Sequence, residues 1–262
     1  MSQLFIGLAF LLHLAGAGFD EPAQGANKSL AEEVKAQTVA YAKQRDAVIA
    51  RLGKAKDDDE RNRIHADYIE LNQRFGKTFL ELARKDPKDP GAYEAIAFGF
   101  TLGSDRPEML RLIRTYHVEH KKIGDLCANL AYDDAAIAEE ILKAIAEHNP
   151  EKENQGKALF SLGMRYKWKA DRRGVSEAEM AGFIASAEKA FTAVKANYAE
   201  VVHFSNKLGL SAEQQMLGLK NMPLLQIGKQ APEIIGEDLD GKPIKLSDYR
   251  GKVVVLDFWG HW

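Results

Sequence analysis

The chain has 262 residues and a formal net charge of −2 at pH 7, from 36 basic and 38 acidic side chains. This balance gives no electrostatic basis for binding nucleic acid or an anionic membrane surface, so we expect neither as a partner. With 45% hydrophobic and 28% charged residues, the composition is that of a soluble globular protein with one large or two ordinary domains.

The first residues differ from the rest. Leu4 to Leu14 are nearly all apolar, and Ala15, Gly16 and Ala17 then supply the small residues of a cleavage site. This pattern predicts a secretory signal peptide over residues 1–17, with export to the periplasm or cell envelope and no membrane span after cleavage. The segment lacks Lys and Arg, so an uncleaved anchor or a plain N-terminal helix stays open. Residues 18–28 form a polar linker.

Residues 29–222 show only helical signals and predict an α-helical domain. Ser29 with Glu32 is a capping box, opening a helix that runs to about Gly53. A second helix follows, and apolar residues three and four apart form one stripe along it. The stripe consists of Ile64, Tyr68, Leu71, Phe75, Phe79 and Leu82.

Proline-rich breaks separate the next predicted helices. Residues 86–91 end the second helix, and a short apolar helix covers 93–102. The chain restarts at 104–107 and continues the apolar stripe through Leu110, Ile113 and Tyr116. Asp133 then opens a helix that carries Ile137, Ile141 and Ile145 and closes at 148–150.

A hairpin over about residues 158–198 resembles a tetratricopeptide repeat. Residues 162–166 match the L-G-x2-Y pattern of its first helix, and Ala187 to Phe191 match the A-x3-F pattern of its second. Gly163 and Ala187 would let the two helices approach closely. The second helix is capped by Ser176 with Glu179. Ser211 with Gln214 is the predicted cap of a last helix, which ends near Pro223.

Several clusters suggest other chemistry, but plainer interpretations are favoured. His117 and His120 are spaced to share a helix face, where they could ligate a metal, yet a solvated polar face is the favoured interpretation. Asp57 to Glu60 lacks the pattern of a calcium loop. Cys127 is interpreted as a small buried hydrophobic residue, and as the only cysteine it excludes an intrachain disulfide here. We expect no metal and no cofactor.

A basic patch is the remaining cluster. It has two interleaved aromatic residues and is a weak nucleic-acid signal in an exported protein of this charge. Its members are Arg165, Tyr166, Lys167, Trp168, Lys169, Arg172 and Arg173.

The end of the chain carries the most specific signals. I-G-x-x-A-P starts at Ile227, followed by L-D-G-K-P, L-S-D-x-x-G-K and finally V-V-V-L-D-F-W-x-x-W, which ends at Trp262. Asp-Gly between two apolar runs predicts a hairpin. Residues 253–256 are apolar without alternation, which is typical of a strand buried on both faces.

These ordered motifs resemble the opening of the thioredoxin-like redoxin family, the superfamily that includes AhpC/TSA, and within it the TlpA and ResA type of envelope thiol-disulfide oxidoreductase. In the family, the first cysteine of Cys-x-x-Cys would follow Trp262. The resemblance therefore implies that residues 223–262 are the N-terminal part of a thioredoxin-like domain, here without its redox cysteines. The expected fold is mainly α, an irregular helical-hairpin array followed by an incomplete thioredoxin-like α/β segment.

The resemblance also implies site residues and partners. Asp257 stands six residues before the expected cysteine, where thioredoxins carry the carboxylate that accepts a proton, and a buried strand would raise its pKa. Trp259 and Trp262 would flank the active-site turn, although core packing is the favoured role of Trp259. The implied partners are disulfide-containing proteins or a thiol-disulfide electron donor. Two alternatives stay open, namely a peroxiredoxin-like antioxidant enzyme and a helical module that binds a protein partner.

Overall fold

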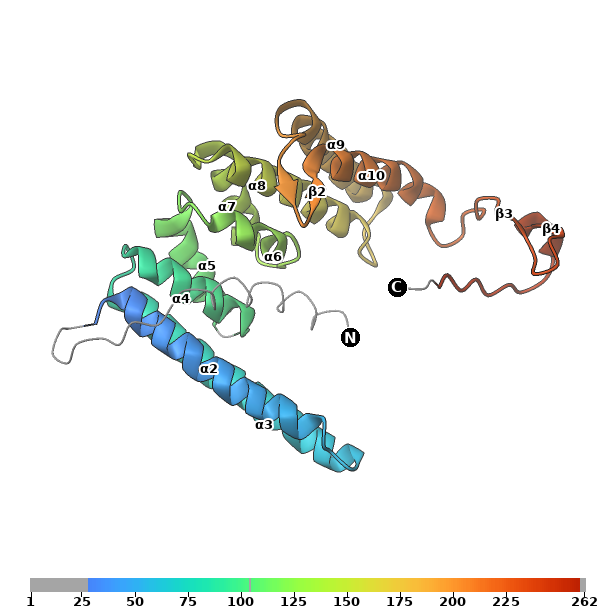
Figure 1. Ribbon diagram of the computed structural model, residues 1–262. Helices are drawn as coiled ribbons and strands as arrows, with labels where there is room; N and C mark the ends of the chain where they lie inside the picture. The colour runs from blue at the N-terminus through green and yellow to red at the C-terminus, as the bar shows by residue number, and fades with distance from the viewer. Residues whose placement is uncertain (1–27, 104, 260–262) are drawn as a thin grey trace.

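The computed structural model describes residues 28–103 and 105–259, and these are mainly α-helical (Figure 1). The helices, with their short π- and 3-10 extensions η, are α2 Leu30–Leu52, α3 Asp58–Lys85, α4 Pro90–Thr101, α5 Arg106–Leu112, η1 Ile113–His117, η2 Ile123–Leu126, α6 Cys127–Ala131, α7 Ala136–His148, α8 Lys152–Ala170, α9 Glu177–Asn197, α10 Leu208–Asn221, η3 Met222–Leu225 and η4 Leu246–Tyr249. The strands are β1 Val202–His203, β2 Asn206–Lys207, β3 Ile235–Glu237 and β4 Pro243–Lys245. The predicted signal peptide lies outside the described residues.

Helices α2 and α3 form the long hairpin at the lower left of Figure 1. The predicted capping box is confirmed, since Ser29 accepts from the Glu32 backbone N–H at 3.3 Å and donates its own N–H to the Glu32 carboxylate at 2.8 Å. The predicted stripe of α3 is buried, apart from Tyr68, which is half-buried. Tyr41 of α2 reaches across to donate to Asn72 at 2.9 Å. The periodic pattern therefore placed this hairpin correctly.

The next helices pack as a continuous array from α4 to α10 (Figure 1). Helix α4 is buried on nearly all sides, because it lies among α2, α3 and α5. The predicted restart gives α5, with Leu110 and Ile113 buried, while Tyr116 is exposed. Helix α7 begins at Ala136, later than Asp133, whose carboxylate accepts from the Ala135 N–H at 2.8 Å and binds Arg106.

Helices α8 and α9 form the predicted hairpin with close contact between its two motifs. A side chain at Gly163 would meet the Phe191 ring at 2.5 Å, so only glycine allows this approach. Phe191 and Ala187 are completely buried. The predicted capping box of Ser176 with Glu179 is confirmed. The contact that the tetratricopeptide resemblance implied is thus present, although the hairpin stands in an irregular array.

The expectation of purely helical structure up to residue 222 was wrong at one place. Strands β1 and β2 pair antiparallel around a two-residue turn, in which Phe204 and Ser205 both have positive φ values, of 48° and 67°. Such turns are normally signalled by Asn-Gly, so this pair gives no turn signal in the sequence. Helix α10 then begins at Leu208, and the predicted cap at Ser211 is not used.

Beyond η3, the chain leaves the helices. Strands β3 and β4 lie apart from the stacked array, at the right of Figure 1. Lys229 still contacts the array through an ion pair with Glu177 of α9, at 3.3 Å. Among the described residues, no helix is long and apolar enough to cross a membrane.

Candidate functional site

The segment that carries the redox motifs begins with a short hairpin. Strands β3 and β4 pair with Ile235 opposite Lys245 and Glu237 opposite Pro243. Gly241 has a φ of 77° in the turn, which is the conformation that favours glycine. The Asp238 carboxylate accepts from the backbone N–H groups of Asp240 and Lys242, at 3.0 and 2.9 Å. The predicted Asp-Gly hairpin is therefore confirmed.

A single helical turn follows the hairpin and is tied back to the start of the segment. In η4, the Ser247 N–H donates to the Glu233 carboxylate at 3.0 Å, and this bond lowers the pKa of Glu233. The Leu246 N–H donates to the Ile234 carbonyl at 2.9 Å. Residues that flank these contacts line a shallow hollow of about 240 Å³. The I-G-x-x-A-P and L-S-D motifs thus lie side by side.

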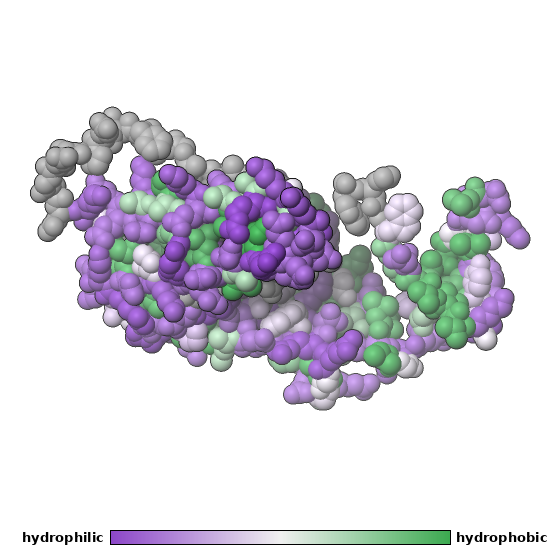
Figure 2. Space-filling model, turned by 90° about the horizontal axis from the view of Figure 1, so that it is seen from below, coloured by the Kyte–Doolittle hydropathy of each residue, from purple (hydrophilic) through white to green (hydrophobic). Residues whose placement is uncertain are grey.

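The predicted strand over residues 253–256 is not formed. These residues are extended without strand pairing, and Val253 and Val255 are 98% and 89% exposed. An apolar strand of this kind needs neighbouring strands and covering helices, and the described residues place none beside it. Figure 2 shows hydrophobic residues gathered on this part of the molecule, at the right of the view.

The predicted site residues belong to the same exposed stretch. Asp257 is exposed, as is Trp259 at 80%. Trp262 lies outside the described residues. The structure therefore leaves the side chains of Asp257 and Trp259 exposed and does not enclose them in a pocket. The roles given to Asp257, Trp259 and Trp262 stay predictions.

Comparison with known proteins decides the nature of this segment. Residues 227–262 match the model of the AhpC/TSA family. Over 38 residues, the chain is 55% identical to the thiol-disulfide oxidoreductase ResA of Bacillus thuringiensis (strain Al Hakam). The matched stretch is 14% of this chain and 22% of that protein. ResA of Bacillus subtilis (strain 168) is 54% identical over 35 residues, or 13% of this chain and 20% of that protein.

Residues 227–262 are a thioredoxin-like redoxin segment. The chain spans about a fifth of the length of the ResA proteins that it matches. No solved structure matches the chain. The redoxin segment is thus similar to one part of those oxidoreductases, and the match does not extend to the helical array.

The histidine pair of the helical array, His117 and His120, does not lie on the solvated polar face that the sequence favoured. His117 is only 3% exposed, while His120 stacks on Tyr93 with ring centroids 3.8 Å apart. Residues 113–117 form a π-helix, whose wider turn shifts the helical phase and directs His117 inward. Within the described chain, no group of three or more metal-ligating side chains comes together.

The basic patch is not one surface. Arg165 is fully buried and donates to the carbonyl oxygens of Leu130, Asp133 and Ala135, so it holds the connection between α6 and α7. Lys169 binds Glu139 at 2.7 Å. The expectation that Arg165 shares a basic face with Arg173 was wrong, because Arg165 is used inside the fold.

Cys127 is buried as predicted. Burial raises the pKa of its thiol to about 12. The thiolate is the reactive form, so a thiol in this environment is inert. Cys127 therefore does not replace the cysteines that a redoxin segment would need.

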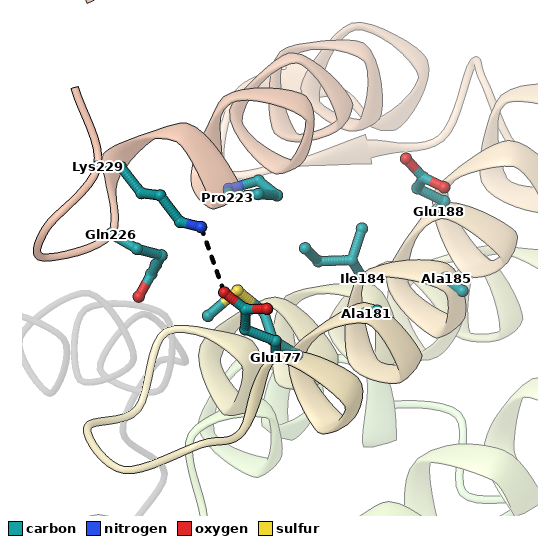
Figure 3. Close-up of a pocket in the computed structure, with 9 residues that line it drawn as sticks. Glu177, Ala181, Ile184, Ala185, Glu188, Pro223, Gln226 and Lys229 are labelled. Atoms are coloured by element: carbon teal, nitrogen blue, oxygen red, sulfur yellow. Dashed lines mark hydrogen bonds and ion pairs between the residues drawn. The ribbon is translucent and has the colours of Figure 1, made fainter. Parts of the chain in front are cut away.

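One surface feature was missed by the sequence analysis. A groove of about 420 Å³ lies between α9 and the connector that follows α10 (Figure 3). Its floor includes Met180 and Ile184 of α9, and Pro223 covers it from the connector. The available signal was the run of apolar residues at positions 180, 181, 184 and 185 of α9. Met180 and Ile184 lie on the face that also carries the buried Ala187 and Phe191, and Ala181 and Ala185 widen this face towards solvent.

Proposed function

We propose that this chain contains the first part of an exported thiol-disulfide oxidoreductase of the thioredoxin or TlpA type. The observation that carries the proposal is the redoxin segment, which retains ordered motifs and more than half identity to ResA proteins up to the residues that precede the redox site. The β3–β4 hairpin and η4 have the local structure that these motifs predict, which also supports it.

The proposed reaction is dithiol–disulfide exchange by a cysteine pair located after Trp262. One thiolate attacks a substrate disulfide and forms a mixed disulfide, which releases one substrate thiolate. The second cysteine loses its proton to Asp257 and attacks the mixed disulfide, which releases the other substrate thiolate. The substrate is then reduced and the cysteine pair oxidised, and a thiol electron donor restores the pair. Asp257 acts only after the completed domain buries it.

The test uses the full reading frame of the gene and reduction of an insulin disulfide at pH 7. We expect activity in the unchanged protein and a loss of about tenfold or more in Asp257→Asn, because general acid–base groups contribute at least that much. Asp240→Asn is the matched control, since Asp240 lies in the exposed β3–β4 turn. Equal loss in both variants, or full activity of Asp257→Asn, would exclude the role of Asp257.

The AhpC/TSA match is also compatible with the alternative of a peroxiredoxin-like enzyme. Consumption of hydrogen peroxide by the same full-length protein, without reduction of insulin, would favour that alternative over dithiol exchange. Export is tested separately. We expect the protein from cell envelopes to begin at Gly18, and a retained Met1 would contradict cleavage of the predicted signal peptide.

A further inference from the structure

The groove between α9 and the connector has a defined lining. Six of its residues come from one face of α9, at spacings of three and four, so they form a continuous strip along the helix. Pro223, Gln226 and Lys229 form the opposite wall. In Figure 3, Ile184 points into the space between these walls. The strip from α9 consists of Glu177, Met180, Ala181, Ile184, Ala185 and Glu188.

The two ends of the groove are acidic. Glu177 marks one end and Glu188 the other, and both are exposed. Lys229 pairs with Glu177 at 3.3 Å, and its side chain is 54% exposed (Figure 3). An exposed pair of this kind contributes little free energy, so another cation can replace Lys229. Glu188 has no ion pair with any residue in the described part of the chain.

The dimensions favour an extended peptide. Glu177 and Glu188 are eleven residues apart on α9, which corresponds to about 16 Å along the helix axis. Side chains of an extended peptide alternate between its two faces, so two that both face the groove are separated by an even number of residues. A separation of six residues covers about 20 Å and reaches both ends. Ala181 and Ala185 leave room for its backbone, while Met180 and Ile184 offer apolar contact. The Gln226 amide lies at the wall, where a peptide backbone needs hydrogen-bond partners.

We propose that this groove binds a short extended peptide of a partner protein, with apolar residues between two basic side chains spaced six residues apart, so that both face the groove. The basic side chains contact Glu177 and Glu188, and the apolar residues lie on Met180 and Ile184. Lys229 occupies the Glu177 end when no peptide is bound. Since Lys229 belongs to the redoxin segment, the bound partner lies next to that segment. This binding does not depend on the proposed redox activity.

The test uses the whole chain and the peptide Ac-Lys-Ala-Val-Ala-Leu-Ala-Lys-NH2, whose Lys, Val and Leu side chains share one face, in isothermal titration calorimetry at low salt. Glu188→Gln should weaken binding about two- to fivefold, as expected for one exposed charge pair, and Glu188→Lys about tenfold or more, because like charges then meet. Lys229→Ala should strengthen binding severalfold by exposing Glu177. Glu81→Gln, an exposed change on α3, is the matched control and should leave the affinity unchanged.

Control peptides separate this site from general attraction between charges. A peptide with Glu in place of both Lys residues, and one with Ser in place of the apolar residues, should both fail to bind. Equal binding of either control, or unchanged affinity in Glu188→Lys, would overturn the proposal. Self-association of the chain that Glu188→Lys abolishes would also overturn it, since the groove would then be an interface between two copies. Circular dichroism of each variant verifies that the helices are retained.

Discussion

The α8–α9 hairpin and the extended residues 253–258 are both rich in apolar side chains, but they use them differently. Phe191 in α9 is completely buried against Gly163, whereas Phe258 in the redoxin segment is 80% exposed. Each helix of the array has neighbours that cover its apolar face, and the extended stretch has none among the described residues. An apolar run therefore specifies a fold only together with the elements that cover it.

The same substitution in the two regions tests this contrast most directly. Phe191→Ala should lower the free energy of unfolding by about 3–5 kcal/mol, because it removes a buried ring and leaves a cavity. Phe258→Ala should change it by less than about 0.5 kcal/mol, since an exposed side chain loses little on truncation. Urea denaturation followed by circular dichroism measures both. A large effect of Phe258→Ala would show that the redoxin segment packs on the helices.

Thiol reactivity distinguishes the two regions by a different property. Burial raises the pKa of Cys127 to about 12, so its thiolate fraction at pH 8 is about a thousandfold below that of an ordinary thiol. In the variant Val255→Cys, the new thiol stands at an exposed position. We expect a thiol reagent to modify that position at least about a thousandfold faster than Cys127.

The comparison has an internal control in the unfolded chain. In concentrated urea, both thiols should react at similar rates, because the burial of Cys127 is then lost. Fast modification of Cys127 in the native protein would contradict the packing of α6 against α8.

Patterns that depend on nearby residues were predicted well. The capping boxes at Ser29 and Ser176, the apolar stripe of α3 and the Asp-Gly hairpin are confirmed. Each is signalled by residues only a few positions apart in sequence, where spacing determines geometry. For the same reason, the motif order over residues 227–262 was enough to indicate a redoxin segment.

Features that depend on distant partners were not predicted. The burial of Arg165 requires three carbonyl groups that lie 30 to 35 residues earlier in the chain. The inward position of His117 requires a π-helix, which has no simple sequence signal. The groove requires α9 to meet the connector of residues 223–229, across more than thirty residues. Residues 253–256 show the converse, because the apolar pattern of a strand is present but the described residues place no strand or helix beside it.

The smallest effect that we predict is a pH dependence of stability that a histidine of the helical array produces. Burial, and then the nearby His120, lower the pKa of His117 to about 4, opposed by a hydrogen bond to the Pro87 backbone. Tyr93 packs against both imidazoles, and Glu94 faces His120. The Nε2 atom of His117 has no partner in the described structure, so a proton placed there would be buried without compensation.

The sign follows from the two pKa values of His117. An unfolded histidine has a pKa of about 6.5, so between pH 6.5 and pH 4 the unfolded chain binds a proton that the folded chain does not. The free energy of unfolding is therefore highest, with respect to His117, above pH 6.5. Up to about 3 kcal/mol of it is lost as the pH falls to 4.

His203 also has a pKa lowered to about 4, so the measurement is made in a His203→Gln background. There, urea denaturation should show a clear loss of stability on acidification, which His117→Phe reduces and the exposed His148→Gln does not. An identical pH profile in His117→Phe would mean that other groups of the array bind these protons.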